Sequence, residues 1–323
     1  MKKILPTPKI PTKTLNNTAS LSIVINNMPS AFDWECLNCV KLHIKEHHPL
    51  DFSQKLRISQ KAEIPFIKKE WKIGKDYYEI IESASKIINF LEKEINEDKY
   101  VYFFFEQYNV PGMKPYHKYI YQHDGLLYGY DNTSRNFYIL SYTSNNKFES
   151  ICIDYDILVT AIIDNKSSRQ YFISCSPTPI EFSLSTQDIY SYLSTCLGFN
   201  NNADLSMYIN MGIYEALVEQ IVMSWKFDID FRSYKLLFEH MECIQYLSQR
   251  LTDLLPNINF SEEMNIANKC ITVSDLLFKV LIKYCLTKRA EIKWRAIEIL
   301  KELQKTEYIL LVSLCDKLID NFG

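Results

Sequence analysis

Apolar and polar positions follow different periods in the two halves of the chain. In the first half, the short aromatic run YVYFFF at 100–105 is typical of a strand buried on both faces. The segments GLLYGYD and RNFYILSY flank the turn-rich link DNTS and predict a β-hairpin, while KFESICI and RQYFISC predict two further strands. Residues 1–30 combine prolines with the alternating letters SLSIVIN, which indicates an extended arm or strand.

Helical spacing takes over beyond residue 180. Ser185 and Asp188 form an N-terminal capping pair, and the helices predicted from there cover 185–196, 205–224, 231–255, 261–286 and 289–320. Two more helices are predicted in the first half: an amphipathic one over 75–95, and a shorter one that begins near Trp34 with Asp33 as its N-cap. The chain is therefore expected to hold an α+β domain at 1–180 and an all-helical domain at 181–323.

Composition narrows the functional classes. The 323 residues are 47% hydrophobic, and 36 basic against 39 acidic residues give a net charge of −3, which argues against a dedicated nucleic-acid binder. Neither of the common glycine-rich phosphate motifs is present. No apolar run approaches about 18 residues, and the start of the chain lacks the apolar core of a signal peptide. These features predict a cytoplasmic protein with neither nucleic acid nor membrane as a partner.

Cys36 is the candidate nucleophile. It follows AFDWE, close to the expected start of a helix, where a partial positive charge lowers the pKa of a thiol and free N–H groups can bind an oxyanion. Most cysteines at such positions are small buried hydrophobes, so both interpretations stay open. Cys39 completes a CxxC spacing with Cys36, but the chain has no second CxxC, so we expect no metal site. Cys39 is either a thiol buried in the core or a second group that faces the same cleft as Cys36.

His123 is the candidate base. It lies at the start of a predicted strand, where a sheet can hold an imidazole toward a helix that packs on it. A cysteine first on a helix and a histidine later on a strand is the order of papain-like enzymes. The residue that orients the imidazole is expected on the next strand, near 140–142.

Three segments carry a resemblance to a known family. FDWECLNCV, YHKYIYQHDGLLYGYDNTSRNFYILSY and IDFRSYKLLFEHMECIQYL resemble the butirosin-biosynthesis acyltransferase-like family, a papain-like, C39-peptidase-like group of nonribosomal peptide and related antibiotic clusters. The last segment includes a pattern formed by Asp230, Arg232, Glu239 and His240. The resemblance covers most of the chain and implies a papain-like fold with Cys36 as acyl acceptor and His123 as base.

One position departs from the family pattern. The family usually has an aspartate on the strand after the histidine, and Ser141 stands there instead. A serine can accept the imidazole N–H bond but cannot stabilise an imidazolium by charge. Asn27 is a candidate oxyanion donor, or an ordinary loop residue.

The resemblance implies acyl transfer. The acyl or peptidyl group would arrive as a thioester on the phosphopantetheine arm of a carrier protein and leave on a small amine or a second carrier-bound acceptor, with no bound cofactor. The alternatives are a pseudoenzyme that binds a carrier or partner protein, and a cysteine hydrolase or peptidase. The segments KLRISQK and KKEWKIGK are candidate basic patches for a carrier.

Two further groups of polar residues have alternative interpretations. His117 lies on a tyrosine-rich loop and either lines an acyl or carrier entrance or is a plain surface histidine. Asp230 is a natural N-cap, and its neighbours Arg232, Glu239 and His240 would form a polar network between helices or a substrate-binding group.

Overall fold

A computed structural model describes most of the chain and divides it into two compact units. The first unit comprises Met1–Ala31 and Lys55–Glu181, and the second comprises Phe32–Gln54 and Phe182–Gly323. Cys36 therefore belongs to the second unit, and His123 to the first. The described residues are 1–7, 30–39, 42–45, 51–52, 65–145, 148–198, 207–225 and 229–321.

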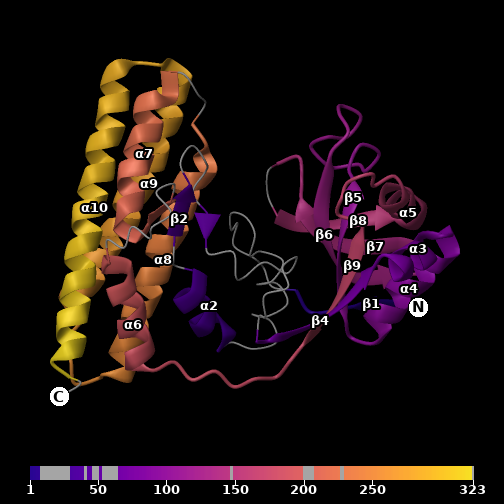
Figure 1. The fold of residues 1–323 in the computed structure, drawn as a ribbon, viewed down its shortest axis with the longest axis horizontal. Helices are drawn as coiled ribbons and strands as arrows, with labels where there is room; N and C mark the ends of the chain where they lie inside the picture. Colours follow the sequence, from indigo (N-terminus) through magenta and orange to yellow (C-terminus); the bar gives the residue numbers. More distant parts are fainter. Residues whose placement is uncertain are drawn as a thin grey trace. The chain divides into compact units, whose positions relative to one another are not determined.

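An antiparallel seven-stranded sheet forms the centre of the first unit (Figure 1). Six of its strands follow the order β4-β9-β5-β6-β7-β8. The seventh, β1, pairs with the last part of β6, past the residues of β6 that pair with β5. The bounds are β1 Lys2–Ile4, β4 Ile67–Ile73, β5 Tyr100–Glu106, β6 Gln122–Asp131, β7 Asn136–Tyr142, β8 Phe148–Asp154 and β9 Tyr171–Pro177. Every residue of β5 is buried, which confirms the interpretation of its aromatic run.

Three helices accompany this sheet, namely α3 (Lys75–Ile81), α4 (Ala84–Asn96) and α5 (Tyr155–Ile163). Tyr77 of α3 and Phe90 of α4 both contact the ring of Phe172 in β9, with centroids 5.3 and 5.1 Å away. Phe172 in turn contacts Phe103 of the central strand β5. These rings form the core between the helices and one face of the sheet.

The helix predicted over 75–95 is interrupted. It breaks before α4, where the Ser83 hydroxyl accepts a hydrogen bond from the amide of Lys86 and so caps a new helix. The sequence pattern also missed α5, because its β-branched residues are typical of a strand. Asp154 caps this helix by accepting hydrogen bonds from the amides of Asp156 and Ile157.

Helices dominate the second unit, as the spacing predicted. They are α2 (Ala31–Cys39), α6 (Thr186–Leu197), α7 (Ile213–Val222), α8 (Phe231–Leu254), α9 (Ser261–Thr287) and α10 (Ala290–Ile319). The capping pair of Ser185 and Asp188 at α6 is confirmed, and so is Asp230 as the N-cap of α8. The helix predicted over 205–224 is shorter than expected, because Met207–Ile209 forms strand β10 against β2 (Leu42–Lys45), which also pairs with β3 (Asp51–Phe52). The whole chain is thus a mixed α+β protein with its helices concentrated at the C-terminus.

Candidate functional site

His123 lies at the beginning of strand β6, on the sheet of the first unit. It pairs with Phe105 near the end of β5, and 27% of its side chain is exposed. Its ring contacts the rings of Tyr121 and of Tyr142, the last residue of β7, with centroids 5.7 and 5.5 Å away. The imidazole thus contacts two aromatic rings while part of its side chain stays exposed to solvent.

The carboxylate of Asp124 is the partner of this imidazole. Its Oδ1 lies 2.5 Å from Nδ1 of His123, and the hydroxyl of Tyr102 also interacts with the Asp124 side chain. The amide nitrogen of Asp124 lies 2.9 Å from the same Nδ1. One ring nitrogen cannot serve both groups at once: a protonated Nδ1 donates to the carboxylate, whereas an unprotonated Nδ1 accepts from the amide. With the proton on Nδ1, the lone pair of Nε2 is left to exchange protons with a substrate.

Charge pairing shifts both pKa values. Burial would lower the pKa of His123, but the hydrogen bond and the charge of Asp124 outweigh it and raise that pKa above its ordinary value of 6.5. Burial would likewise raise the pKa of Asp124, but the hydrogen bond and charge of His123, helped by Tyr102, hold that pKa below its ordinary value. The pair therefore favours the charged imidazolium–carboxylate form, which suits a base that must hold a proton during a reaction.

Ser141 has a different role from the one predicted for it. Its hydroxyl is fully buried and donates a 2.7 Å hydrogen bond to the backbone carbonyl of Asp124. Ser141 thereby fixes the backbone that carries the carboxylate. The predicted position on the next strand, 140–142, does border His123, but through the ring of Tyr142.

Sequence reasoning missed Asp124 as the carboxylate that contacts His123. Neighbouring residues on a strand point to opposite faces, so the residue after the histidine is not an obvious partner for it. The only indication of this contact in the sequence is the tripeptide QHD, which places a carboxylate directly after the candidate base.

Cys36 is fully buried and is the sixth residue of α2. The helix begins at Ala31 rather than near Trp34, so Cys36 lies in its second turn, beyond the first four N–H groups that a helix leaves without internal partners. The partial positive charge and the free N–H groups at the helix start therefore act on this thiol less than the sequence suggested. Asp33 is not the cap: its carboxylate accepts hydrogen bonds from Tyr246 (2.7 Å) and Arg250 (3.1 Å) of α8.

The structure describes some of the remaining predicted positions and not others. Asn27 and the segment KLRISQK lie outside the described residues, and the encounter of Cys36 with His123 stays a prediction. Lys68 of the second basic segment forms an ion pair with Glu70 along β4. His240 bonds Glu307 of α10 through Nε2 at 2.8 Å, which confirms a polar contact between helices for that residue.

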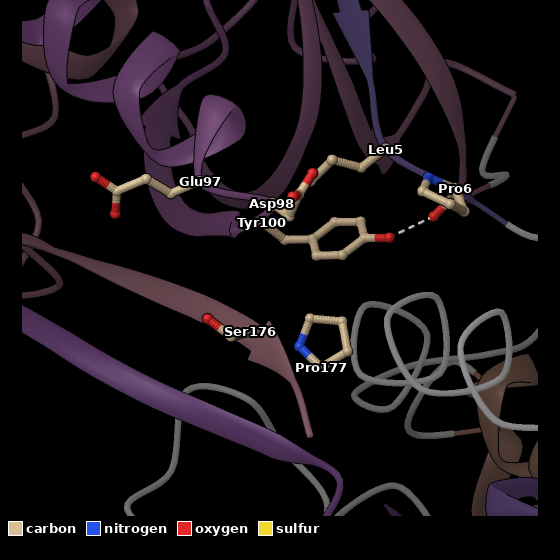
Figure 2. A pocket seen from close by; sticks show the side chains of 7 residues that line it. All are labelled: Leu5, Pro6, Glu97, Asp98, Tyr100, Ser176 and Pro177. Carbon is tan, nitrogen blue, oxygen red and sulfur yellow. Dashed lines mark hydrogen bonds between the residues drawn. The ribbon is translucent and has the colours of Figure 1, made fainter. Parts of the chain in front are cut away.

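A pocket of about 400 Å³ opens at the other end of β5 (Figure 2). Its lining residues are Leu5, Pro6, Glu97, Asp98, Tyr100, Ser176 and Pro177, and the Tyr100 hydroxyl points to the carbonyl of Pro6, 2.6 Å away. Tyr100 and Phe105, the partner of His123, are five positions apart on an extended strand, which corresponds to roughly 17 Å. This pocket is therefore distinct from the surroundings of His123 within the same unit.

A scan against protein-family models finds no match for this chain, and a search of curated proteins finds no significant relative. Among the described residues, no helix has both the length and the apolar character needed to cross a membrane.

Proposed function

We propose that the chain is a cysteine-dependent acyltransferase of papain-like type, in which Cys36 accepts the acyl group and the His123–Asp124 pair moves the protons. The observation that carries the proposal is the contact of 2.5 Å between Nδ1 of His123 and the Asp124 carboxylate. It supplies the charged partner that Ser141 cannot provide. The order of cysteine and histidine, and the resemblance of the three segments, support the same function.

The proposed reaction has two halves. The Cys36 thiolate attacks the thioester carbonyl of a carrier's phosphopantetheine arm, and the arm leaves as a thiol that takes its proton from the His123 imidazolium. An amine then attacks the acyl-cysteine, gives a proton to Nε2 of His123, and releases the Cys36 thiolate. Asp124 stabilises the imidazolium at the start and at the end of this cycle.

Intact-mass analysis tests this function. The full chain is mixed with the acetyl thioester of N-acetylcysteamine, and we expect one acetyl group on Cys36 that persists in water and is discharged by an added amine. His123→Ala should slow acylation about 10²–10⁴-fold, the usual contribution of a general acid–base group. Cys152→Ser is the matched control, because Cys152 is an exposed cysteine on strand β8 and should be dispensable.

A second function, non-catalytic binding of a partner protein, is favoured by the complete burial of Cys36. It predicts that no acetyl group resides on Cys36, or that exposed Cys152 is modified instead. An adduct that is lost in water without amine would indicate a hydrolase.

A further inference from the structure

A loop rich in exposed aromatic residues connects β5 to β6. Residues 107–121, called the aromatic loop below, present the exposed side chains of Tyr108, Tyr116, His117, Tyr119, Ile120 and Tyr121. Ile120 is 75% exposed and Tyr119 is 47% exposed. A concentration of exposed aromatic and apolar side chains on one loop is typical of a surface that contacts another molecule.

The base of the aromatic loop is held by Glu106, a buried residue at the end of β5. Its Oε1 accepts hydrogen bonds from the amides of Tyr108 and Tyr121, each 2.9 Å long, and its Oε2 accepts from the side chain of Gln122 at 2.7 Å. The amide of Gln107 closes the same base by donating to the carbonyl of Tyr121 at 2.9 Å. The two ends of the loop are therefore fixed next to His123.

The interior of the aromatic loop is ordered as well. Val110 and Met113 point into the core and are 0% and 2% exposed. His117 adopts a left-handed backbone, with φ of 52°, while its amide donates to the carbonyl of Tyr108 and its ring stacks on Tyr116 at 4.1 Å. A non-glycine residue in this conformation is held there by its surroundings. The exposed rings are therefore set in place before any partner arrives, which reduces the entropy lost on binding.

The aromatic loop is continuous with the candidate site. Tyr119 contacts Tyr121, Tyr121 contacts His123, and His123 contacts Tyr142. The amide of Ser144, just after β7, donates to the carbonyl of Gly112 and ties the loop to the neighbouring hairpin. A partner seated on the loop would have its contact surface beside the imidazole.

The charge of the aromatic loop is positive in a chain that is acidic as a whole. Between residues 107 and 121 there are two lysines, Lys114 and Lys118, and no aspartate or glutamate. Arg169, from the loop before β9, lies over the ring of Phe104, 4.8 Å from its centroid, and adds a third cation near the end of β5 that leads into the loop. Such a surface complements an acidic one. It is too sparse in cations for a strand of nucleic acid, whose binding depends on neutralising many phosphates.

We propose that the aromatic loop docks a partner protein through an acidic helical face, with the tyrosines and Ile120 supplying apolar contact and the lysines supplying complementary charge. In the reaction proposed above, this partner would be the acylated carrier protein. That identification rests on the proposed function, whereas the docking surface itself does not.

Charge reversal tests the proposal. The probe is a fluorescently labelled acidic type II acyl carrier protein without its phosphopantetheine arm, and binding to the full chain is followed by anisotropy at rising salt. Lys114→Glu combined with Lys118→Glu should weaken binding about tenfold or more, and salt should weaken wild-type binding. The control is Lys75→Glu with Lys93→Glu, which makes the same charge change on exposed helical positions of the same unit.

Apolar truncation provides a second, independent test. Tyr119→Ser combined with Ile120→Ser should also weaken binding about tenfold, because exposed aromatic anchors dominate the affinity of such interfaces. The matched control is Tyr308→Ser with Ile309→Ser, since this pair on α10 has the same residue types and is 45% and 47% exposed. Circular dichroism of each variant verifies that the chain is folded.

Failure of the docking proposal can be told apart from failure of the proposed function. No binding of the probe by wild type, equal affinity of loop and control variants, or binding of a single-stranded oligonucleotide in place of the probe would overturn the docking surface. None of these measurements requires acyl transfer. Conversely, a loop-dependent affinity without any acetyl adduct on Cys36 would support the docking surface and reject the enzyme.

Discussion

At the scale of single residues, the chemistry of His123 depends on the residue that follows it. Asp124 contacts Nδ1 directly, and Ser141 holds the backbone of Asp124 in place. The imidazole is partly exposed and contacts two aromatic rings. This combination gives one charged pair in which Nδ1 of the partly exposed imidazole contacts the carboxylate.

Replacing Asp124 with asparagine should lower the pKa of His123. Burial, which disfavours the charged imidazole, remains in the variant, while the carboxylate that opposes it is removed. NMR titration of the His123 ring measures the change, with His123→Ala identifying the resonance. Ser141→Ala is the control and should shift this pKa much less, because its hydroxyl bonds a carbonyl of the backbone; an unchanged pKa in Asp124→Asn would contradict the ion pair.

The same pair should make stability depend on pH. The raised pKa of His123 stabilises the folded chain at low pH, and this contribution is lost as pH rises through the folded-state pKa. The lowered pKa of Asp124 stabilises it at higher pH, and this contribution is lost as pH falls through the folded-state pKa. The stability gap between wild type and Asp124→Asn should thus be widest between the ordinary values of 3.8 and 6.5, at about 1 kcal/mol, and should narrow on both sides. Urea unfolding at several pH values measures this difference in stability. A difference that does not change with pH would contradict the pairing of His123 with Asp124.

Local sequence rules predicted part of this site and could not predict the rest. The position of His123 at a strand start, and the approach of residues 140–142 on the next strand, follow from counting across a hairpin turn. The pairing with Asp124 breaks the alternation of side chains along a strand, so no periodic pattern indicates it. The start of α2 was misplaced because Asp33 resembles a cap, whereas its carboxylate is used by Arg250, 217 positions later.

At the scale of elements, polar groups connect the helices of the second unit. Glu307 of α10 is 2% exposed, bonds His240 of α8 through one oxygen, and accepts from the hydroxyl of Tyr214 of α7 through the other. Burial and the charge of Glu307 raise the pKa of Tyr214 well above its ordinary value, so this hydroxyl remains a donor. Helical spacing predicted these helices, but the meeting of residues 67 positions apart is a property of the tertiary fold.

Removing the acceptor should destabilise the second unit. Glu307→Leu leaves the His240 ring and the Tyr214 hydroxyl buried without this partner and should reduce the free energy of unfolding by about 3 kcal/mol. Glu307→Gln keeps the shape and offers an oxygen and an N–H group in the same places, so its loss should be clearly smaller. Urea unfolding compares the two variants, and equal stability of Glu307→Leu and wild type would show that the cluster contributes nothing net.

At the scale of the whole molecule, the second unit is built from two separate stretches of sequence. The segment Phe32–Gln54 belongs with the C-terminal helices, and Asp33 joins α2 to α8 within that unit. Dividing the sequence once, near residue 180, cannot reveal such a discontinuous unit, because its contacts join residues more than 200 positions apart. Cys36 lies in this second unit and His123 in the first, so neither unit by itself indicates the proposed cooperation of their side chains.

The pH dependence of Cys36 alkylation tests this cooperation most directly. Iodoacetamide modification is followed by peptide mass mapping, with exposed Cys152 as the internal reference. We predict that Cys36 reacts well below the ordinary thiol pKa of about 8.5, and that His123→Ala moves its reactivity to higher pH while Cys152 is unaffected. A Cys36 that stays unreactive, or that reacts with the same pH profile in wild type and in His123→Ala, would contradict the pairing of this thiol with this imidazole.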